Sequence, residues 1–103
     1  MILHGLKVRF LRLNMQINTP DDLFKIYAFS DEAKLEIKQL FNANKVFVLQ
    51  INALCLSIKD EPYKAEFTKL HTNTYLAKLS NICVIYKIEN NKIFFCNITL
   101  SKK

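Results

Sequence analysis

Two alternating apolar runs in residues 76–100 constrain the fold of this chain more than any other feature. Alternation of β-branched and aromatic residues is typical of strands with one buried face. The alternating residues are Ile82, Val84, Tyr86 and Ile88 in the first run, and Ile93, Phe95, Ile98 and Leu100 in the second. Asn90 and Asn91 lie between the runs and tolerate positive φ, so residues 89–92 predict a tight hairpin turn. A hairpin of this size needs apolar cover from elsewhere in the chain.

Two amphipathic segments before the hairpin can supply that cover. Ser30 is a good N-cap, and Asp31 and Glu32 place negative charge in the first helical turn. The apolar stripe of this first helix comprises Ala33, Ile37, Leu40 and Phe41. A second helix is predicted from about Val46 to the Asp60-Glu61-Pro62 stop, and its stripe comprises Phe47, Ile51, Leu54, Cys55 and Ile58. The pair predicts an antiparallel αα-hairpin.

Further strands are predicted over residues 7–17, 24–29, 67–71 and 75–79. Thr19 and Pro20 indicate a loop or a short helical start between the first two of these strands. The predicted order is β-(β)-α-α-β-β-β. We therefore expect one α+β domain over residues 1–103, in which the αα-hairpin covers one face of an antiparallel sheet. Residues 1–23 form an N-terminal extension and residues 24–103 the core.

Composition excludes several classes of protein. The chain has no apolar run of about 18 residues, so we expect no membrane span. Lys7, Arg9 and Arg12 break the apolar N-terminus, which argues against a secretory signal. The three cysteines form no Cys-x-x-Cys pair, which favours a reducing cytoplasm over disulfides or a metal site. The single glycine excludes glycine-rich phosphate loops, and we expect no cofactor.

The net charge of +6 is unevenly distributed along the chain. Residues 21–61 carry five basic and seven acidic side chains, whereas residues 62–103 carry seven lysines and two glutamates. Positive charge gathered on one part of a small domain indicates a nucleic acid or another acidic partner. A lysine-rich composition with no such role is the alternative.

Several stretches together resemble the RelE/ParE superfamily of toxins from type II toxin–antitoxin systems. FKIYAFSDEAKLEIKQL is similar to the family's first strand and helix, and a second helix ends near Pro62. FTKL at residues 67–70 and NICVIYKIENNKIFFCNI at residues 81–98 resemble its later strands and hairpin. The resemblance covers about residues 24–103.

The resemblance implies a basic, metal-independent toxin that is neutralised by a partner antitoxin. A RelE-like protein enters the ribosome and cuts mRNA, with basic side chains stabilising the transition state and a general base assisting attack by the ribose hydroxyl. A ParE-like protein poisons DNA gyrase instead.

Two departures from the family pattern leave a third function possible. Ile82 or Cys83 holds the hairpin position where the family usually has arginine, and Ser101 to Lys103 stand where it commonly ends in arginine or histidine. Lysine cannot reproduce the two-pronged hydrogen bonding of arginine. These departures favour a non-catalytic binding module on the same fold, whereas the basic second half favours the toxin. An antitoxin or immunity-type binder fits less well, because such proteins are usually acidic.

Three residues are candidates for catalysis. Lys69 and His71 share a strand face under simple alternation, so they could hold a phosphate and move a proton. Lys102 follows the last strand, where the family places a functional basic residue. Exposed strand residues and a frayed terminus are the structural alternatives.

Five further residues are candidates for binding RNA or phosphate: Lys64, Lys78, Lys87, Lys103 and Tyr75. The lysines would contact phosphates, and Tyr75 could stack on a base. The alternatives are solvated surface for the lysines and filling of the sheet edge for Tyr75. Tyr86 is expected in the core because it shares a face with Val84 and Ile88.

Overall fold

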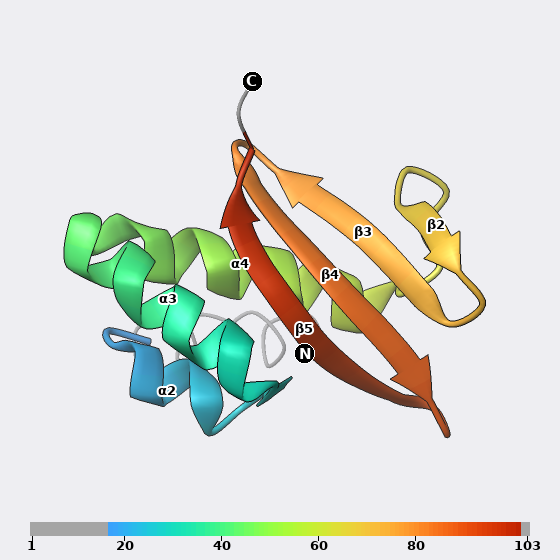
Figure 1. Ribbon diagram of the computed structural model, residues 1–103, viewed down its shortest axis with the longest axis horizontal. Helices are drawn as coiled ribbons and strands as arrows, with labels where there is room; N and C mark the ends of the chain where they lie inside the picture. The colour runs from blue at the N-terminus through green and yellow to red at the C-terminus, as the bar shows by residue number, and fades with distance from the viewer. Residues whose placement is uncertain (1–16, 102–103) are drawn as a thin grey trace, which may run out of the picture.

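The structure, a computed structural model, describes residues 17–101. These residues form an α+β domain with three helices and a five-stranded sheet. In chain order the elements are α2 (Pro20–Phe24), β1 (Ala28–Phe29), α3 (Asp31–Ala43), α4 (Val46–Asp60), β2 (Thr68–His71), β3 (Thr74–Leu79), β4 (Ile82–Glu89) and β5 (Lys92–Leu100) (Figure 1). The strand order in the sheet is β1-β5-β4-β3-β2. The strand predicted over residues 7–17 lies outside the described residues, except for Ile17.

The β4–β5 hairpin forms as the alternating runs predict. Asn90 and Asn91 both adopt positive φ, at 53° and 64°, which is the backbone that a two-residue hairpin turn needs. The alternating residues of β4, Ile82, Val84, Tyr86 and Ile88, are all buried. Ile85 pairs with Asn97 and Tyr86 pairs with Phe95, so Cys96 has no partner and forms a bulge. The bulge brings Phe95 and Ile98 to the same buried face although their spacing is odd.

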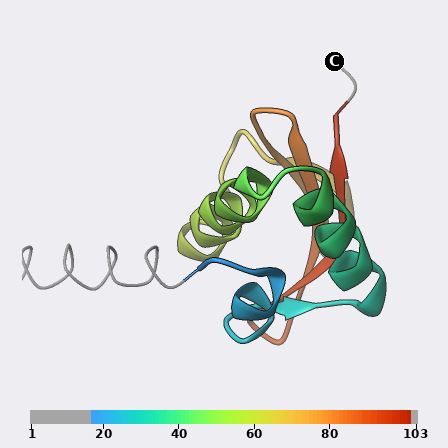
Figure 2. The same ribbon diagram turned by 90° about the vertical axis from the view of Figure 1, so that its left-hand side faces the viewer.

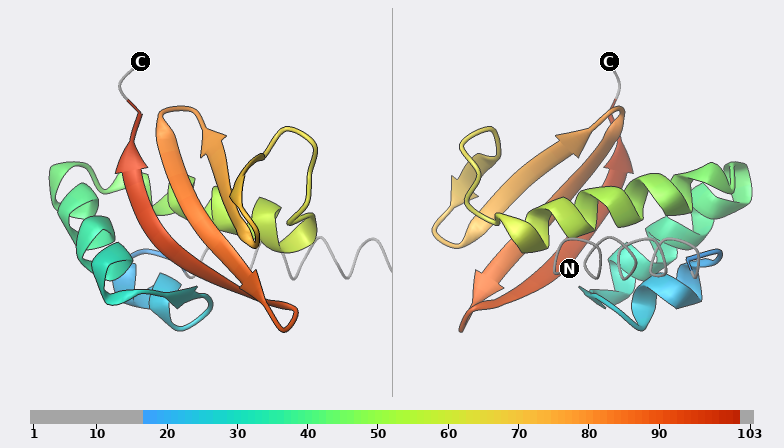
Figure 3. Two further views of the ribbon diagram at one scale, coloured as in Figure 1. Left: turned by 45° about the vertical axis from the view of Figure 1, so that its right-hand side comes forward. Right: turned by 180° about the vertical axis from the view of Figure 1, so that it is seen from behind.

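The helix α4 covers one face of the sheet (Figures 1 and 3). Its apolar stripe packs against strands β3 to β5, and the helix ends before Pro62 as predicted. The fully or nearly buried residues of α4 are Val48, Ile51, Asn52, Leu54, Cys55 and Ile58. No described helix lies on the opposite face, which we call the open face (Figure 1).

Three features of the predicted arrangement are wrong. The strand predicted over residues 24–29 is reduced to Ala28 and Phe29, because α2 begins at Pro20 and takes up Phe24. The Asp22 carboxylate accepts the N–H groups of Asn18 and Thr19, which lowers its pKa and stabilises the start of α2. The sheet is mixed and not antiparallel, because β1 runs parallel to β5. The helices also form no continuous N-terminal block, since β1 separates α2 from α3.

The helix α3 lies beside β5 and satisfies part of its edge (Figure 2). Ser30 caps the helix by accepting the N–H of Ala33, and its hydroxyl donates to the Cys96 carbonyl at 2.7 Å. The Glu36 carboxylate accepts the N–H of Ile98 at 2.7 Å. Since β1 pairs only with residues 94 and 95, Ser30 and Glu36 supply hydrogen bonds to the β5 backbone beyond the end of β1.

Replacing Glu36 with alanine should destabilise the domain by about 1–3 kcal/mol, because the part-buried Ile98 N–H loses its acceptor. Glu36→Gln keeps an acceptor oxygen and should cost about 1 kcal/mol or less. Urea denaturation of the two variants measures the difference. Equal destabilisation by both variants would show that the charge of Glu36, and not its acceptor oxygen, matters at this edge.

An aromatic row crosses the helix-covered face of the sheet. Phe29, Phe95, Tyr86 and Tyr75 are aligned by strand pairing in β1, β5, β4 and β3. Tyr75 stacks on Tyr86 with ring centroids 5.5 Å apart, and Phe29 contacts Phe95 at 5.3 Å. The Tyr86 hydroxyl donates to the Pro62 carbonyl at 2.6 Å, so it ties the loop after α4 to the sheet. Tyr86 is in the core, as predicted.

Candidate anion-binding face

The open face is built by the outward-facing residues of β2 to β5. Residues that pair across antiparallel strands project to the same side of a sheet, so the register assigns them. Across the described strands these residues are Thr68, His71, Thr74, Leu76, Lys78, Cys83, Ile85, Lys87, Glu89, Lys92, Phe94, Cys96, Asn97 and Thr99. The face therefore combines an apolar centre with lysines and small polar side chains.

One transverse row of the open face joins four strands. Phe94 pairs with Lys87, Lys87 with Thr74, and Thr74 with His71. Phe94 is 41% exposed, so its ring is accessible beside the lysine. Stacking on an aromatic ring and contact with a phosphate are the two interactions that a single-stranded nucleic acid makes with a sheet.

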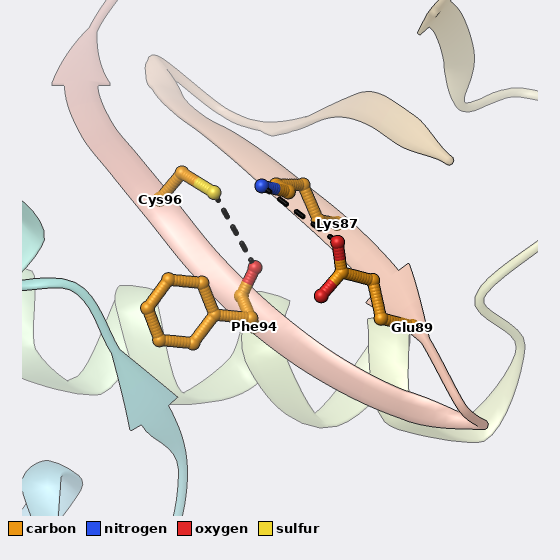
Figure 4. A network of polar contacts seen from close by, with 4 residues as sticks. All are labelled: Lys87, Glu89, Phe94 and Cys96. Carbon is orange, nitrogen blue, oxygen red and sulfur yellow. Dashed lines mark hydrogen bonds and ion pairs between the residues drawn. The ribbon is translucent and has the colours of Figure 1, made fainter. Parts of the chain in front are cut away.

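Lys87 forms an ion pair with Glu89, two residues along β4 (Figure 4). Their charged atoms are 3.9 Å apart and both side chains are well exposed, so the pair is weak and solvent competes with it. The Cys96 thiol points toward the Phe94 carbonyl on the same side (Figure 4). Burial raises the pKa of Cys96, Lys87 opposes that rise and Glu89 adds to it. The thiol is therefore neutral at pH 7, and Lys87 remains available to an anion.

Lys78 lies on the open face, and Lys64 lies in the segment between α4 and β2. Both border a depression of about 280 Å³ between α4 and the β2–β3 pair. Lys64 forms an ion pair with Glu66 at 3.3 Å and lies 5.8 Å from the Phe67 ring centroid. Lys78 forms no ion pair with any described residue, so of these two lysines it is the freer to bind an anion.

Lys69 and His71 do not share a face of the sheet. Lys69 pairs with Tyr75 and His71 pairs with Thr74, and these two partners are consecutive residues of β3. The register shifts between Lys69 and His71, so Leu70 is an extra residue and simple alternation fails. His71 therefore belongs to the open face and Lys69 to the face that carries the aromatic row. Both side chains are exposed.

A double-mutant cycle tests this separation. Lys69→Ala and His71→Ala should change the free energy of RNA binding additively, within about 0.5 kcal/mol, because the two side chains share no partner. Filter binding of a short single-stranded RNA to the four proteins gives the coupling energy. A coupling above about 1 kcal/mol would mean that the two residues act as one unit.

Tyr75 is engaged in the aromatic row. One ring face stacks on Tyr86, and Tyr63 contacts it edge-on at 5.7 Å. This geometry favours a packing role for Tyr75 in the sheet over stacking on a base. The other two candidates, Lys102 and Lys103, lie outside the described residues.

Charge separates the sheet from the helices. Strands β2 to β5 carry four lysines and one acidic residue, Glu89, whereas α2, α3 and α4 carry three lysines and six acidic residues. Three of the four strand lysines, Lys78, Lys87 and Lys92, lie on the open face together with Glu89, and Lys69 lies on the other face. An anion approaching the open face therefore meets a positive surface.

Phe94 was not a candidate from the sequence, although it is the exposed aromatic of the open face. Its signal was its position next to Phe95: two consecutive aromatics in a strand cannot both face the core. That signal assigns one of them to the other face without saying which face is uncovered.

Within residues 17–101, no group of three His, Cys, Asp or Glu side chains is placed to hold a metal ion. The same residues contain no helix with the length and apolar character of a membrane span. No protein-family profile matches the chain, and searches of curated proteins and of solved structures returned no match.

Proposed function

We propose that this protein is a toxin of the RelE/ParE type that binds RNA on the open face of its sheet and acts on mRNA at the ribosome. The observation that carries the proposal is the row of Phe94, Lys87 and His71 on a face that no described helix covers. The resemblance of residues 24–103 to that superfamily supports the same class. A cytoplasmic location and a cognate antitoxin belong to this proposal, and DNA gyrase is the alternative target.

The open face offers the chemistry that such a toxin needs for binding. Lys78 and Lys87 can neutralise phosphates, and Phe94 can stack on an unpaired base. His71 is the one histidine among the described residues of that face, and an imidazole can transfer a proton to or from a ribose hydroxyl. Cleavage through these residues needs no metal ion.

A second candidate function is RNA binding without cleavage. The observation that favours it is the separation of Lys69 from His71 onto opposite faces. The direct cross-strand neighbour of His71 is Thr74, and Lys87, the basic residue of the same transverse row, lies one strand further away. Lysine is also a weaker substitute for the arginine that the family uses.

Reconstituted translation distinguishes the two candidates. Purified protein is added to ribosomes stalled on a defined mRNA, and primer extension maps new 5′ ends. The toxin proposal predicts cuts at the ribosomal A site that disappear in His71→Ala. RNA that stays intact while it co-sediments with the protein would support RNA binding without cleavage. Intact RNA that does not bind the protein would contradict both candidate functions.

A further inference from the structure

A second, separate pocket lies at the end of the sheet opposite the β3–β4 turn, on the helix-covered side. It has a volume of about 450 Å³ and lies between the end of α4, the segment before β1 and the β4–β5 turn. Its base is formed by buried side chains, Phe95 at 1%, Tyr27 at 7% and Ile88 at 8% exposure. Volumes of this size and an apolar, aromatic lining are typical of sites for small organic ligands.

Lysines supply the charge of this pocket. The Lys59 ammonium lies 5.9 Å from the centroid of the Tyr27 ring, so it is held at the apolar wall. Lys92, the first residue of β5, also borders the pocket, and no carboxylate does. Neither lysine forms an ion pair with a described residue. Asp60 is close enough to contribute to the raised pKa of Tyr27, but it does not border the pocket.

Tyr27 gives the pocket a fixed aromatic wall. Burial raises the pKa of Tyr27, and its hydroxyl donates to the Asn52 side chain at 2.9 Å. The phenol therefore stays neutral and presents its ring to the pocket. An unpaired ammonium next to an apolar, aromatic base is complementary to a molecule that has a flat apolar body and one anionic group.

We propose that this pocket binds a small aromatic or apolar anion, with the body on Phe95, Tyr27 and Ile88 and the carboxylate or phosphate on Lys59. The site differs from the open face, because Phe95 and Ile88 of its base project to the helix-covered side of the sheet. Lys92, at the border of the pocket, pairs with Glu89 and belongs to the open face. Its occupancy does not depend on the toxin activity.

Two fluorescent probes with the same aromatic body test the proposal on the full chain. Anilinonaphthalene sulfonate carries an anionic group, and N-phenylnaphthylamine is its neutral counterpart. The double variant Lys59→Gln with Lys92→Gln should lower the affinity for the sulfonate probe by about tenfold and leave the affinity for the neutral probe unchanged. The matched control is Lys34→Gln with Lys38→Gln, because those lysines also lie over an aromatic ring, Phe24, but border no such pocket.

Sulfonate binding that survives the first variant, or that falls equally in the control, would overturn the proposal. Competition then identifies the anionic group: displacement by phenyl phosphate indicates a phosphate ligand, and displacement by phenylacetate a carboxylate. Displacement by neither, with the probe bound, would also overturn it.

Discussion

Replacing Lys78 and Lys87 with glutamine should weaken binding of a single-stranded RNA by about 100-fold at low salt. Each lysine is expected to form one charge-assisted contact with a phosphate, worth about 1.5 kcal/mol, and about 1.4 kcal/mol corresponds to tenfold in affinity. Lys78 has no ion-pair partner among the described residues, and Lys87 has only the long contact with Glu89. Both face the same side of the sheet.

Salt dependence separates this electrostatic effect from damage to the fold. The slope of log affinity against log salt should fall by about 1.4 in the double variant, since each phosphate contact on a single strand contributes about 0.7. The control is Lys34→Gln with Lys38→Gln, which removes the same charge from α3. If the control lowers affinity and slope as much as the open-face variant, net charge and not the open face governs binding.

Replacing Tyr86 with alanine should cost about 3–5 kcal/mol of folding free energy, the second large effect that we expect. Tyr86 is 0% exposed and contacts Tyr75, Phe67 and Phe95. A loss of this size approaches the whole stability of a small domain, so the variant should be largely unfolded in mild denaturant. Tyr86→Phe keeps the ring but leaves the Pro62 carbonyl without its donor, and should cost about 1–2 kcal/mol.

The pH dependence of stability provides an independent test of Tyr86. Burial, with smaller contributions from Tyr75 and Tyr63, raises the pKa of Tyr86 to about 12. The folded state therefore holds this proton above the ordinary tyrosine pKa of about 10, so its contribution to stability is complete below pH 10 and is lost as the pH rises toward 12. Tyr86→Phe should flatten that part of the urea denaturation profile. An unchanged decline would assign it to another group, such as Tyr27.

Local patterns predicted much of the fold because the signals are themselves local. Ser30 caps α3, Pro62 follows the end of α4, and Asn90 and Asn91 form the β4–β5 turn, each as the sequence indicates. Alternation in β4 assigned its buried face because that face is covered along its whole length. These features depend on neighbours within a few residues.

The errors arise where distant segments decide the structure. Residues 24–29 contain a strand-like pattern, but the Asp22 contacts stabilise the start of α2, which includes Phe24. Only Ala28 and Phe29 pair with β5, in parallel. Nothing in the local sequence specifies that partner or the mixed sheet that follows. Glu36 is 62 residues away from Ile98 in the sequence, yet its carboxylate accepts the Ile98 N–H at the edge of β5.

The site was predicted less well than the fold. Lys78, Lys87 and His71 lie on one face, but the register shift at Leu70 moves Lys69 to the other. A one-residue shift changes the face of a side chain and leaves the hydrophobic pattern of a short exposed strand unchanged. Phe94 was missed because the face that lacks a helix becomes known only once the helices are placed.

Induction of the chain in a bacterial host, with pulse-labelling of protein and DNA synthesis, tests the proposed function most directly. Protein synthesis should collapse first. Lys78→Gln with Lys87→Gln should abolish the collapse, whereas Lys34→Gln with Lys38→Gln should not. If DNA synthesis stops first, the target is DNA gyrase and not the ribosome. Unimpaired growth with folded protein present would contradict the toxin proposal and leave RNA binding on the open face as the function to be tested.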